Sequence, residues 1–126
     1  MQRLDNTDIE FEKIASWCRH GKYEDAELCM IEGCSVPIDH QDRNGNTLLH
    51  IACQNGNKRM IKMCLRKGAS MNLRNTRGNT ALHYAFGFGY HEQGEYLRGK
   101  GANDSILNCD GLTCYEGLTA TELEHL

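Results

Sequence analysis

Apolar residues recur along the chain at helical spacing, in short segments that glycines separate. Leu49, Ala52 and Cys53 lie at positions i, i+3 and i+4, which places them on one face of a helix. A second apolar stripe follows within residues 60–65, and Gly56 between the two segments is typical of a residue that ends a helix. Helices of about ten residues are too short to be stable alone in water. The pattern therefore predicts paired short helices that need neighbours to bury their apolar faces.

Polar residues with turn and capping properties precede these helices. The segment 42–45 (DRNG) is rich in turn residues, and Thr47 then stands where a helix N-cap belongs. Near the start of the chain, Thr7 and Glu10 have the spacing of a capping box for an earlier helix.

The whole pattern repeats every 33 residues. Three sets of glycines share this spacing: Gly45, Gly78 and Gly111, then Gly56 and Gly89, then Gly68 and Gly101. The segment 46–52 (NTLLHIA) also matches the segment 79–85 (NTALHYA). Such self-similarity is typical of a repeat protein, in which each unit contacts only its neighbours. The copies before and after these two are fainter, as expected for terminal units whose outer face has no neighbour.

These residues resemble the ankyrin repeat: a turn with Gly, then Thr-x-Leu-His-x-Ala, then Gly, then a second helix that ends in Gly-Ala. The match is nearly complete at 42–74, good at 75–107, and partial at 8–41 and 108–118. The resemblance implies an all-α fold, an ankyrin-repeat solenoid of helix-turn-helix units joined by β-hairpin-like turns.

We accordingly expect a single ankyrin-repeat domain over residues 1–126. Its units are approximately 8–41 as a degenerate N-terminal cap, 42–74, 75–107, and 108–126 as a partial C-terminal cap. The tail beyond 118 does not supply a full unit, and it either caps the stack as a short helix or belongs to a chain that continues.

The third unit departs from the family pattern in its second helix. Gly94 and Gly99 lie inside it, and each costs about 1 kcal/mol relative to Ala in a helix. We therefore expect this helix to be the least stable element. Phe86 aligns with Cys53 by the 33-residue period and is expected in the core.

Charge is unevenly distributed along the chain. The formal net charge is −3, but residues 41–101 hold ten bases and three acids, whereas residues 1–40 hold four bases and nine acids. Asymmetry of this kind bears on partners, not on the fold. An acidic start without an apolar stretch argues against a secretory signal.

Seven cysteines, an odd number, favour a cytoplasmic protein with reduced thiols over a disulfide framework. Cys53 and Cys64 fall on the apolar helix faces, and Cys18 and Cys29 align with them, so we expect buried small apolar residues. Neither Cys29 with Cys34 nor Cys109 with Cys114 has the spacing of a zinc pair, and no metal site is expected.

No catalytic constellation emerges from the sequence. His50 and His83 recur at one repeat position, so the resemblance implies that they bond backbone groups of the turns. No Ser/His/Asp set and no phosphate-binding loop is evident. We therefore expect no enzyme activity and no cofactor.

The resemblance implies a curved stack whose turn tips and first helices bind another protein. Ten residues fall on this surface by register and are the predicted contact residues: Arg43, Asn44, Asn46, Gln54, Asn55, Arg74, Thr76, Arg77, Asn79 and Phe88. The arginines predict either a basic edge for an acidic partner or an ordinary solvated surface. Phe88 is either an exposed anchor or a ring packed on its neighbours.

The expected function is thus a protein–protein interaction module, a monomer located in the cytoplasm. Nucleic acid is disfavoured because the chain is acidic overall and lacks an aromatic platform, and no segment could span a membrane. The alternative is a regulatory or targeting ankyrin domain cut from a larger, possibly enzymatic protein. A third reading, a small molecule or metal bound through the thiols, is the least favoured.

Overall fold

The computed structural model describes residues 5–117, and within them all regular secondary structure is helical. The helices are α1 (Asn6–Arg19), α2 (Tyr23–Ile31), α3 (Leu48–Gln54), α4 (Lys58–Arg66), α5 (Ala81–Gly87) and α6 (His91–Gly99). The predicted all-α solenoid is confirmed. The part of the predicted last unit beyond residue 117, with its capping helix, lies outside the described residues.

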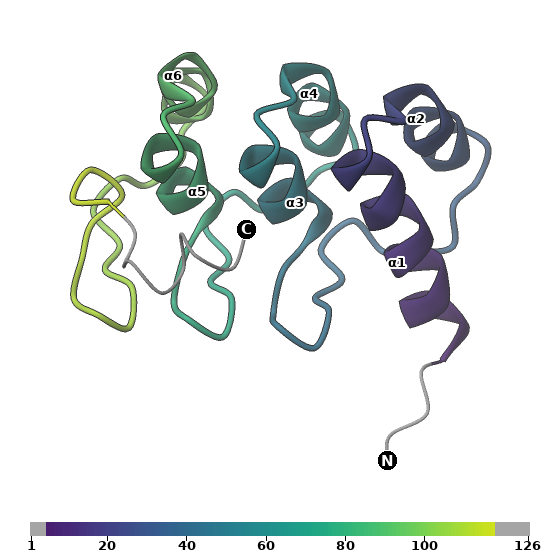
Figure 1. Ribbon diagram of the computed structural model, residues 1–126, viewed down its shortest axis with the longest axis horizontal. Coiled ribbons are helices and arrows are strands. Elements are labelled where there is room, and N and C mark those ends of the chain that lie inside the picture. The colour runs from purple at the N-terminus through teal and green to yellow at the C-terminus, as the bar shows by residue number, and fades with distance from the viewer. Residues whose placement is uncertain (1–4, 118–126) are drawn as a thin grey trace.

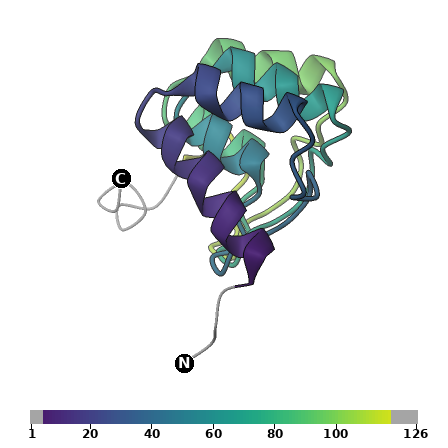
Figure 2. The ribbon, with the colours of Figure 1, turned by 90° about the vertical axis from the view of Figure 1, so that its right-hand side faces the viewer.

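The helices form two layers. Figure 1 shows α1, α3 and α5 side by side in one layer, and α2, α4 and α6 above them in the second. The long turns project downward from the first layer. Seen end-on in Figure 2, the later pairs lie behind α1 and α2, with the turns extending to one side. Each helix pair thus covers one face of the next pair, as in other repeat proteins.

The first helix begins earlier than its sequence predicts. Asp5, not Thr7, is the N-cap: its carboxylate accepts a hydrogen bond from the Asp8 backbone N–H at 2.8 Å. The Asp8 side chain accepts a bond from the Asp5 N–H, which completes a capping box two residues nearer the N-terminus than predicted. The prediction of a box from Thr7 to Glu10 is therefore wrong, because Asp at N-cap is at least as good an acceptor as Thr. The Glu10 side chain is therefore not part of the capping box of α1.

Helices α3 and α5 begin with a capping box in which histidine replaces the usual glutamate. Thr47 is the N-cap of α3, and the Nδ1 atom of His50 accepts from the Thr47 backbone N–H at 3.0 Å. Thr80 and His83 repeat the arrangement at the start of α5, with 3.1 Å between the same atoms. The predicted N-cap role of Thr47 is confirmed, and Thr80 has the same role in the next unit. The hydrogen bond at Nδ1 fixes the direction in which the second ring nitrogen points.

The second ring nitrogen joins each unit to the next. The Nε2 atom of His50 lies 3.0 Å from the carbonyl oxygen of Asn79, and that of His83 lies 2.9 Å from the carbonyl oxygen of Leu112. Since the Nδ1 atom accepts, the Nε2 atom carries the proton and donates. The prediction that these histidines bond turn backbone groups is confirmed.

The turns are built alike. The side-chain oxygen of Asp42 accepts from two backbone N–H groups, those of Asn44 and Asn46, both at 2.9 Å. Gly45 closes this turn with φ of +76°, and a Cβ there would lie 2.8 Å from the Cα of Asn75. Glycine is therefore required both for the left-handed conformation and for the close approach of the neighbouring turn.

A continuous core runs through the three helix pairs. Its fully buried members include Phe11 and Ile14 of α1, Ile51 and Cys53 of α3, Met60, Ile61 and Cys64 of α4, and Leu97 of α6. The predicted burial of Cys18, Cys53 and Cys64 is confirmed, whereas Cys29 is only half-buried. Burial of apolar surface against copies of the same motif is what stabilises these short helices.

Phe86 is only half-buried, so its predicted place in the core is confirmed in part. Its ring lies against the buried Gly94 of α6, where a Cβ would be 2.7 Å from the Phe86 Cζ atom. The low stability expected for α6 stays a prediction.

Candidate protein-binding surface

Backbone hydrogen bonds hold the turn tips in register. The Thr76 N–H donates to the Asn44 carbonyl at 3.0 Å, and the Thr76 hydroxyl donates to the same oxygen at 2.9 Å. One unit further, the Cys109 N–H donates to the Arg77 carbonyl at 3.0 Å. Adjacent tips are therefore joined by equivalent bonds, which makes them a row of fixed spacing and not a set of independent loops.

Three predicted arginines are exposed on this row. Arg43 and Arg77 lie within the tips, and Arg74 precedes the second tip, where its Nε atom donates to the Gly78 carbonyl at 3.2 Å. The Arg74 carbonyl in turn accepts from the Gln41 side chain at 3.0 Å. The three arginines thus belong to the row of turn tips at one edge of the stack.

Two of the predicted contact residues are in the interior, and this part of the prediction is wrong. Asn79 is completely buried and Asn46 is 9% exposed. The Asn46 side-chain oxygen accepts from the Asn75 amide at 2.9 Å, and that of Asn79 accepts from the Asn108 amide at 2.9 Å. A buried amide must be hydrogen-bonded, and here the partner is an asparagine amide at the start of the next turn. These asparagines join the units, so a partner cannot reach them.

The remaining predicted residues keep some exposure. Asn44 and Thr76 are exposed on the tips, and Gln54 and Asn55 are half-buried at the end of α3. The Asn55 amide donates to the Ile51 carbonyl at 2.8 Å, so this side chain caps its own helix. Phe88 is half-buried and stacks on Tyr84, with ring centroids 5.8 Å apart. Phe88 is therefore packed on a neighbour and only partly exposed, and its role as an anchor stays a prediction.

Sequence reasoning missed an acidic flank beside the first tip. A hollow between α1 and this tip is lined by the neutral Asn44 and by charges of both signs: Asp8, Glu12, Arg19, Asp42 and Arg43. A hydrogen bond from His40 at 2.9 Å holds the pKa of the Asp8 carboxyl below its usual range. The signal in the sequence was the excess of acids within residues 1–40. The basic edge therefore ends at α1, where the surface becomes mixed in charge.

Most of the positive charge of the middle segment lies elsewhere. Seven of the ten bases in residues 41–101 are in α4, in α6 or at their C-caps: Lys58, Arg59, Lys62, Arg66, Lys67, Arg98 and Lys100. Three of these lysines surround the Tyr96 ring at 5.5 to 5.6 Å from its centroid. The outer layer is thus also basic, and it provides a natural control for experiments on the tips.

The buried thiols serve packing. Burial raises the pKa of Cys18 to about 11, and it raises those of Cys53 and Cys64 further. A thiol in this state is protonated at neutral pH, and it is neither a good nucleophile nor a good metal ligand.

Comparison with known proteins agrees with this geometry. The pattern of ankyrin repeats, in three copies, matches residues 14–108. The chain belongs to the ankyrin repeat family. Ankyrin repeats are in general protein-interaction modules.

Individual relatives of this ankyrin chain differ widely in size. Protein phosphatase 1 regulatory subunit 27 of Mus musculus is 33% identical over 110 residues, which are 86% of this chain and 71% of that protein. The ADP-ribosylation factor GTPase-activating protein AGD4 of Arabidopsis thaliana is 30% identical over 99 residues, 79% of this chain but 11% of AGD4. The serine/threonine-protein kinase TNNI3K of Mus musculus is 40% identical over 56 residues, 7% of that kinase. This ankyrin chain therefore spans about a tenth of the length of several relatives.

Within residues 5–117, every helix is too short or too polar to cross a membrane.

Proposed function

We propose that this ankyrin stack is a non-catalytic module that binds a partner protein on its first helices and turn tips. The contact residues that remain accessible are Arg43, Asn44, Gln54, Asn55, Arg74, Thr76, Arg77 and Phe88. The observation that carries the proposal is the hydrogen-bonded register of the tips, from Asn44 to Thr76 and from Arg77 to Cys109. A preorganised surface loses little conformational entropy on binding.

The side chains have different roles in this proposal. The exposed arginines attract an acidic surface, orient it and raise the association rate. Phe88, whose ring is fixed by Tyr84, supplies apolar area that is partly exposed already. Thr76 donates two hydrogen bonds to the backbone carbonyl of Asn44, one from its N–H and one from its hydroxyl. These bonds do not use the side-chain amide of Asn44, which is available for the partner.

The same proposal places the protein in the cytoplasm as a monomer. All seven cysteines are free thiols, which supports a reducing compartment.

Charge reversal on the tips tests the proposal. A partner would first be captured from cell lysate on the immobilised chain and identified, and its dissociation constant then measured by calorimetry. We expect Arg43→Glu, Arg74→Glu and Arg77→Glu together to weaken binding by at least tenfold, about 1.4 kcal/mol. The matched control is Lys62→Glu, Arg66→Glu and Lys100→Glu, which makes the same change of charge on the outer layer.

If the tip variant binds like the wild type, or if the outer variant loses as much affinity, the basic edge is irrelevant. Circular dichroism of both variants would verify that they remain folded.

A second candidate is a regulatory or targeting domain within a larger protein. Two relatives favour it, since AGD4 is named a GTPase-activating protein and TNNI3K a kinase, and this chain matches only a small share of each. Sequencing the transcript across the codon for residue 126 tests the idea. An open frame that continues into a further domain supports it, and a stop codon directly after residue 126 removes it.

A further inference from the structure

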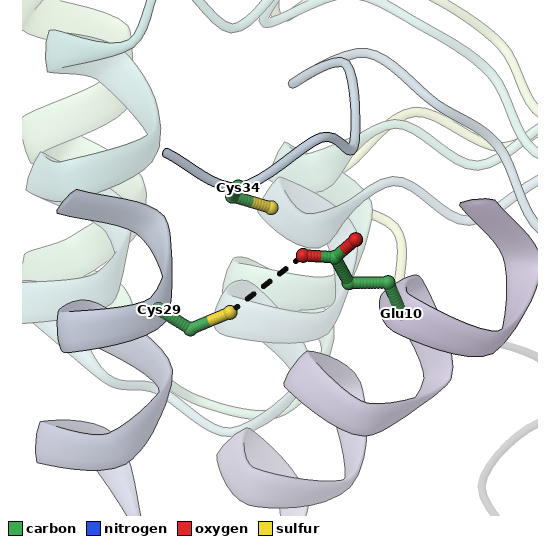
Figure 3. Close-up of side chains that lie close together, drawn as sticks. All are labelled: Glu10, Cys29 and Cys34. Carbon is green, nitrogen blue, oxygen red and sulfur yellow. Dashed lines mark hydrogen bonds between the residues drawn. The ribbon is translucent and has the colours of Figure 1, made fainter. Parts of the chain in front are cut away.

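Three potential metal ligands from separate segments converge at the N-terminal end of the stack. Figure 3 shows the Glu10 carboxylate on α1 facing the thiols of Cys29 on α2 and Cys34 in the following loop. One ligand atom from each residue lies within 4.8 Å of the other two, and all three side chains are half-buried. An ion can therefore reach the cluster from solvent and still be partly enclosed.

Neighbouring groups orient each of these side chains. The Ser35 hydroxyl donates to the Oε2 atom of Glu10, which turns Oε1 toward Cys29, whose thiol lies 3.9 Å away. The backbone N–H of Val36 donates to the Cys34 sulfur at 3.4 Å. Supporting hydrogen bonds of this kind are typical of the surroundings of metal ligands, because they fix the ligand's direction.

We propose that Glu10, Cys29 and Cys34 bind a Zn²⁺ ion, with water as the fourth ligand. Zinc accepts both thiolate sulfur and carboxylate oxygen as ligands, and the cluster offers two of the first and one of the second. Thiolates select against Mg²⁺ and Ca²⁺, which prefer oxygen alone. The proposal is independent of partner binding at the turn tips, since the cluster lies between α1, α2 and the loop that follows α2.

The required movement is small. Tetrahedral zinc with Zn–S bonds of about 2.3 Å and a Zn–O bond of about 2.1 Å brings its ligand atoms to about 3.5 to 3.8 Å from one another. Atoms within 4.8 Å of one another must therefore shift by about 1 Å. Cys34 belongs to a loop, so it can move without unwinding a helix.

The affinity for zinc depends on the protonation of the ligand side chains. The hydrogen bond from Ser35 holds the pKa of Glu10 below its usual range, so this ligand is already ionised. Burial, together with the nearby charge of Glu10, raises the pKa of the Cys34 thiol. Zinc must displace the thiol protons, so its affinity rises with pH.

The spacing of Cys29 and Cys34 does not predict a zinc pair, because it takes only the two cysteines into account. The proposed third ligand, Glu10, lies nineteen positions before Cys29 and is close to the thiols only in the folded chain. The bound ion would join α1, α2 and the loop that follows α2, which contains Cys34. The expected consequence is a more stable N-terminal unit.

The chain contains its own control for chance proximity of thiols. Cys109 and Cys114 have the same sequence separation, but Cys109 is exposed, Cys114 is buried, and their thiols contact different carbonyl groups. Within residues 5–117 the convergence of three ligands is found only at Glu10, Cys29 and Cys34.

Titration of the reduced full chain with Co²⁺, a spectroscopic substitute for Zn²⁺, tests the site. We expect one equivalent to produce a sulfur-to-cobalt charge-transfer band, and one equivalent of Zn²⁺ to abolish it. Cys29→Ser and Cys34→Ser should each remove most of this band. Glu10→Gln should keep the band but weaken Co²⁺ binding by about ten- to a hundredfold, and Cys109→Ser should change nothing.

A second readout does not depend on cobalt. Zn²⁺ should raise the melting temperature of the wild type and of Cys109→Ser, and it should leave that of Cys34→Ser unchanged. Thiol counting before each titration verifies that all seven cysteines are reduced. The proposal is overturned if the reduced wild type gives no charge-transfer band, or if Cys34→Ser retains the band and the thermal shift.

Discussion

The second and third units fill the same two repeat positions with one large and one small side chain, but in the opposite order. In the second unit Cys53 of α3 and Ile61 of α4 are both completely buried. The 33-residue period places Phe86 and Gly94 at the same positions of α5 and α6. In the second unit the large residue is on the second helix and the small one on the first. In the third unit the large residue is on the first helix and the small one on the second.

This exchange explains a glycine that looks unfavourable by itself. Gly94 costs about 1 kcal/mol of helix propensity, yet any larger residue would meet the Phe86 ring at 2.7 Å. Protein interiors tolerate substitution best when the total volume is kept. The comparison teaches that a repeat unit conserves the volume of a pair of positions and not the residue at either one.

The largest expected effect is truncation of the large residue in the second unit. Ile61→Ala should lower the free energy of unfolding by about 2–5 kcal/mol, because it leaves a cavity in a completely buried site. Urea denaturation followed by circular dichroism measures the change. The neighbouring Lys62 is exposed, and Lys62→Ala should stay within about 0.5 kcal/mol. Equal effects of the two substitutions would show that α4 does not hold the core as described.

Removing the histidine that joins the two units should cost slightly less. His50→Ala loses the capping bond to Thr47 and leaves the Asn79 carbonyl without its donor, so we expect about 2–3 kcal/mol. His83→Ala should cost less, because its acceptor Leu112 lies in the last described turn and is half-buried. Thermal denaturation of both variants compares the two junctions, and a larger loss at His83 would reverse the expected order.

The exchange of large and small residues predicts that Gly94→Ala changes stability in opposite directions in two backgrounds. Gly94→Ala should destabilise the wild type by about 1–2 kcal/mol, since the added methyl group must displace the Phe86 ring. In a Phe86→Cys background the same substitution should stabilise by about 1 kcal/mol through helix propensity alone. A double-mutant cycle in urea measures the coupling. If Gly94→Ala has the same effect in both backgrounds, the two positions do not share their volume.

The smallest effect concerns pH. Burial lowers the pKa of His50, so the folded protein takes up its proton at lower pH than the unfolded chain, in which histidine titrates near about 6.5. The stabilising contribution is therefore present above this value, and it decreases as the pH falls through the pKa of the folded state. Denaturation between pH 7.5 and 5 should show the decrease in the wild type, with a smaller decrease in His50→Ala. A wild type equally stable across this range would contradict the role of His50.

The sequence was sufficient to predict the features that every repeat unit shares. It was insufficient to predict contacts that depend on which residue lies opposite in the folded chain. The 33-residue period predicted the stack, and the N-cap position of Thr47 and the backbone role of His50 followed from it. These features are local, and each copy supports the next. The positions of the helices therefore needed no knowledge of the folded chain.

The errors concern contacts between segments far apart in the chain. Asn46 and Asn79 look like exposed turn residues, but each amide pairs with that of the following turn. The partner of Gly94 becomes evident only when α5 and α6 are placed together, and the convergence of Glu10 with two thiols involves three segments. Sequence spacing contains none of these distances.

The central claim is that the turn tips and first helices form the binding surface. Hydrogen–deuterium exchange of the chain, alone and with its captured partner, tests this claim directly. We expect slower exchange on binding at the tips around Asn44 and Thr76 and at the C-terminal end of α5 near Phe88, with α4 and α6 unchanged. Slower exchange confined to α2, α4 and α6 would place the partner on the outer layer and contradict the account.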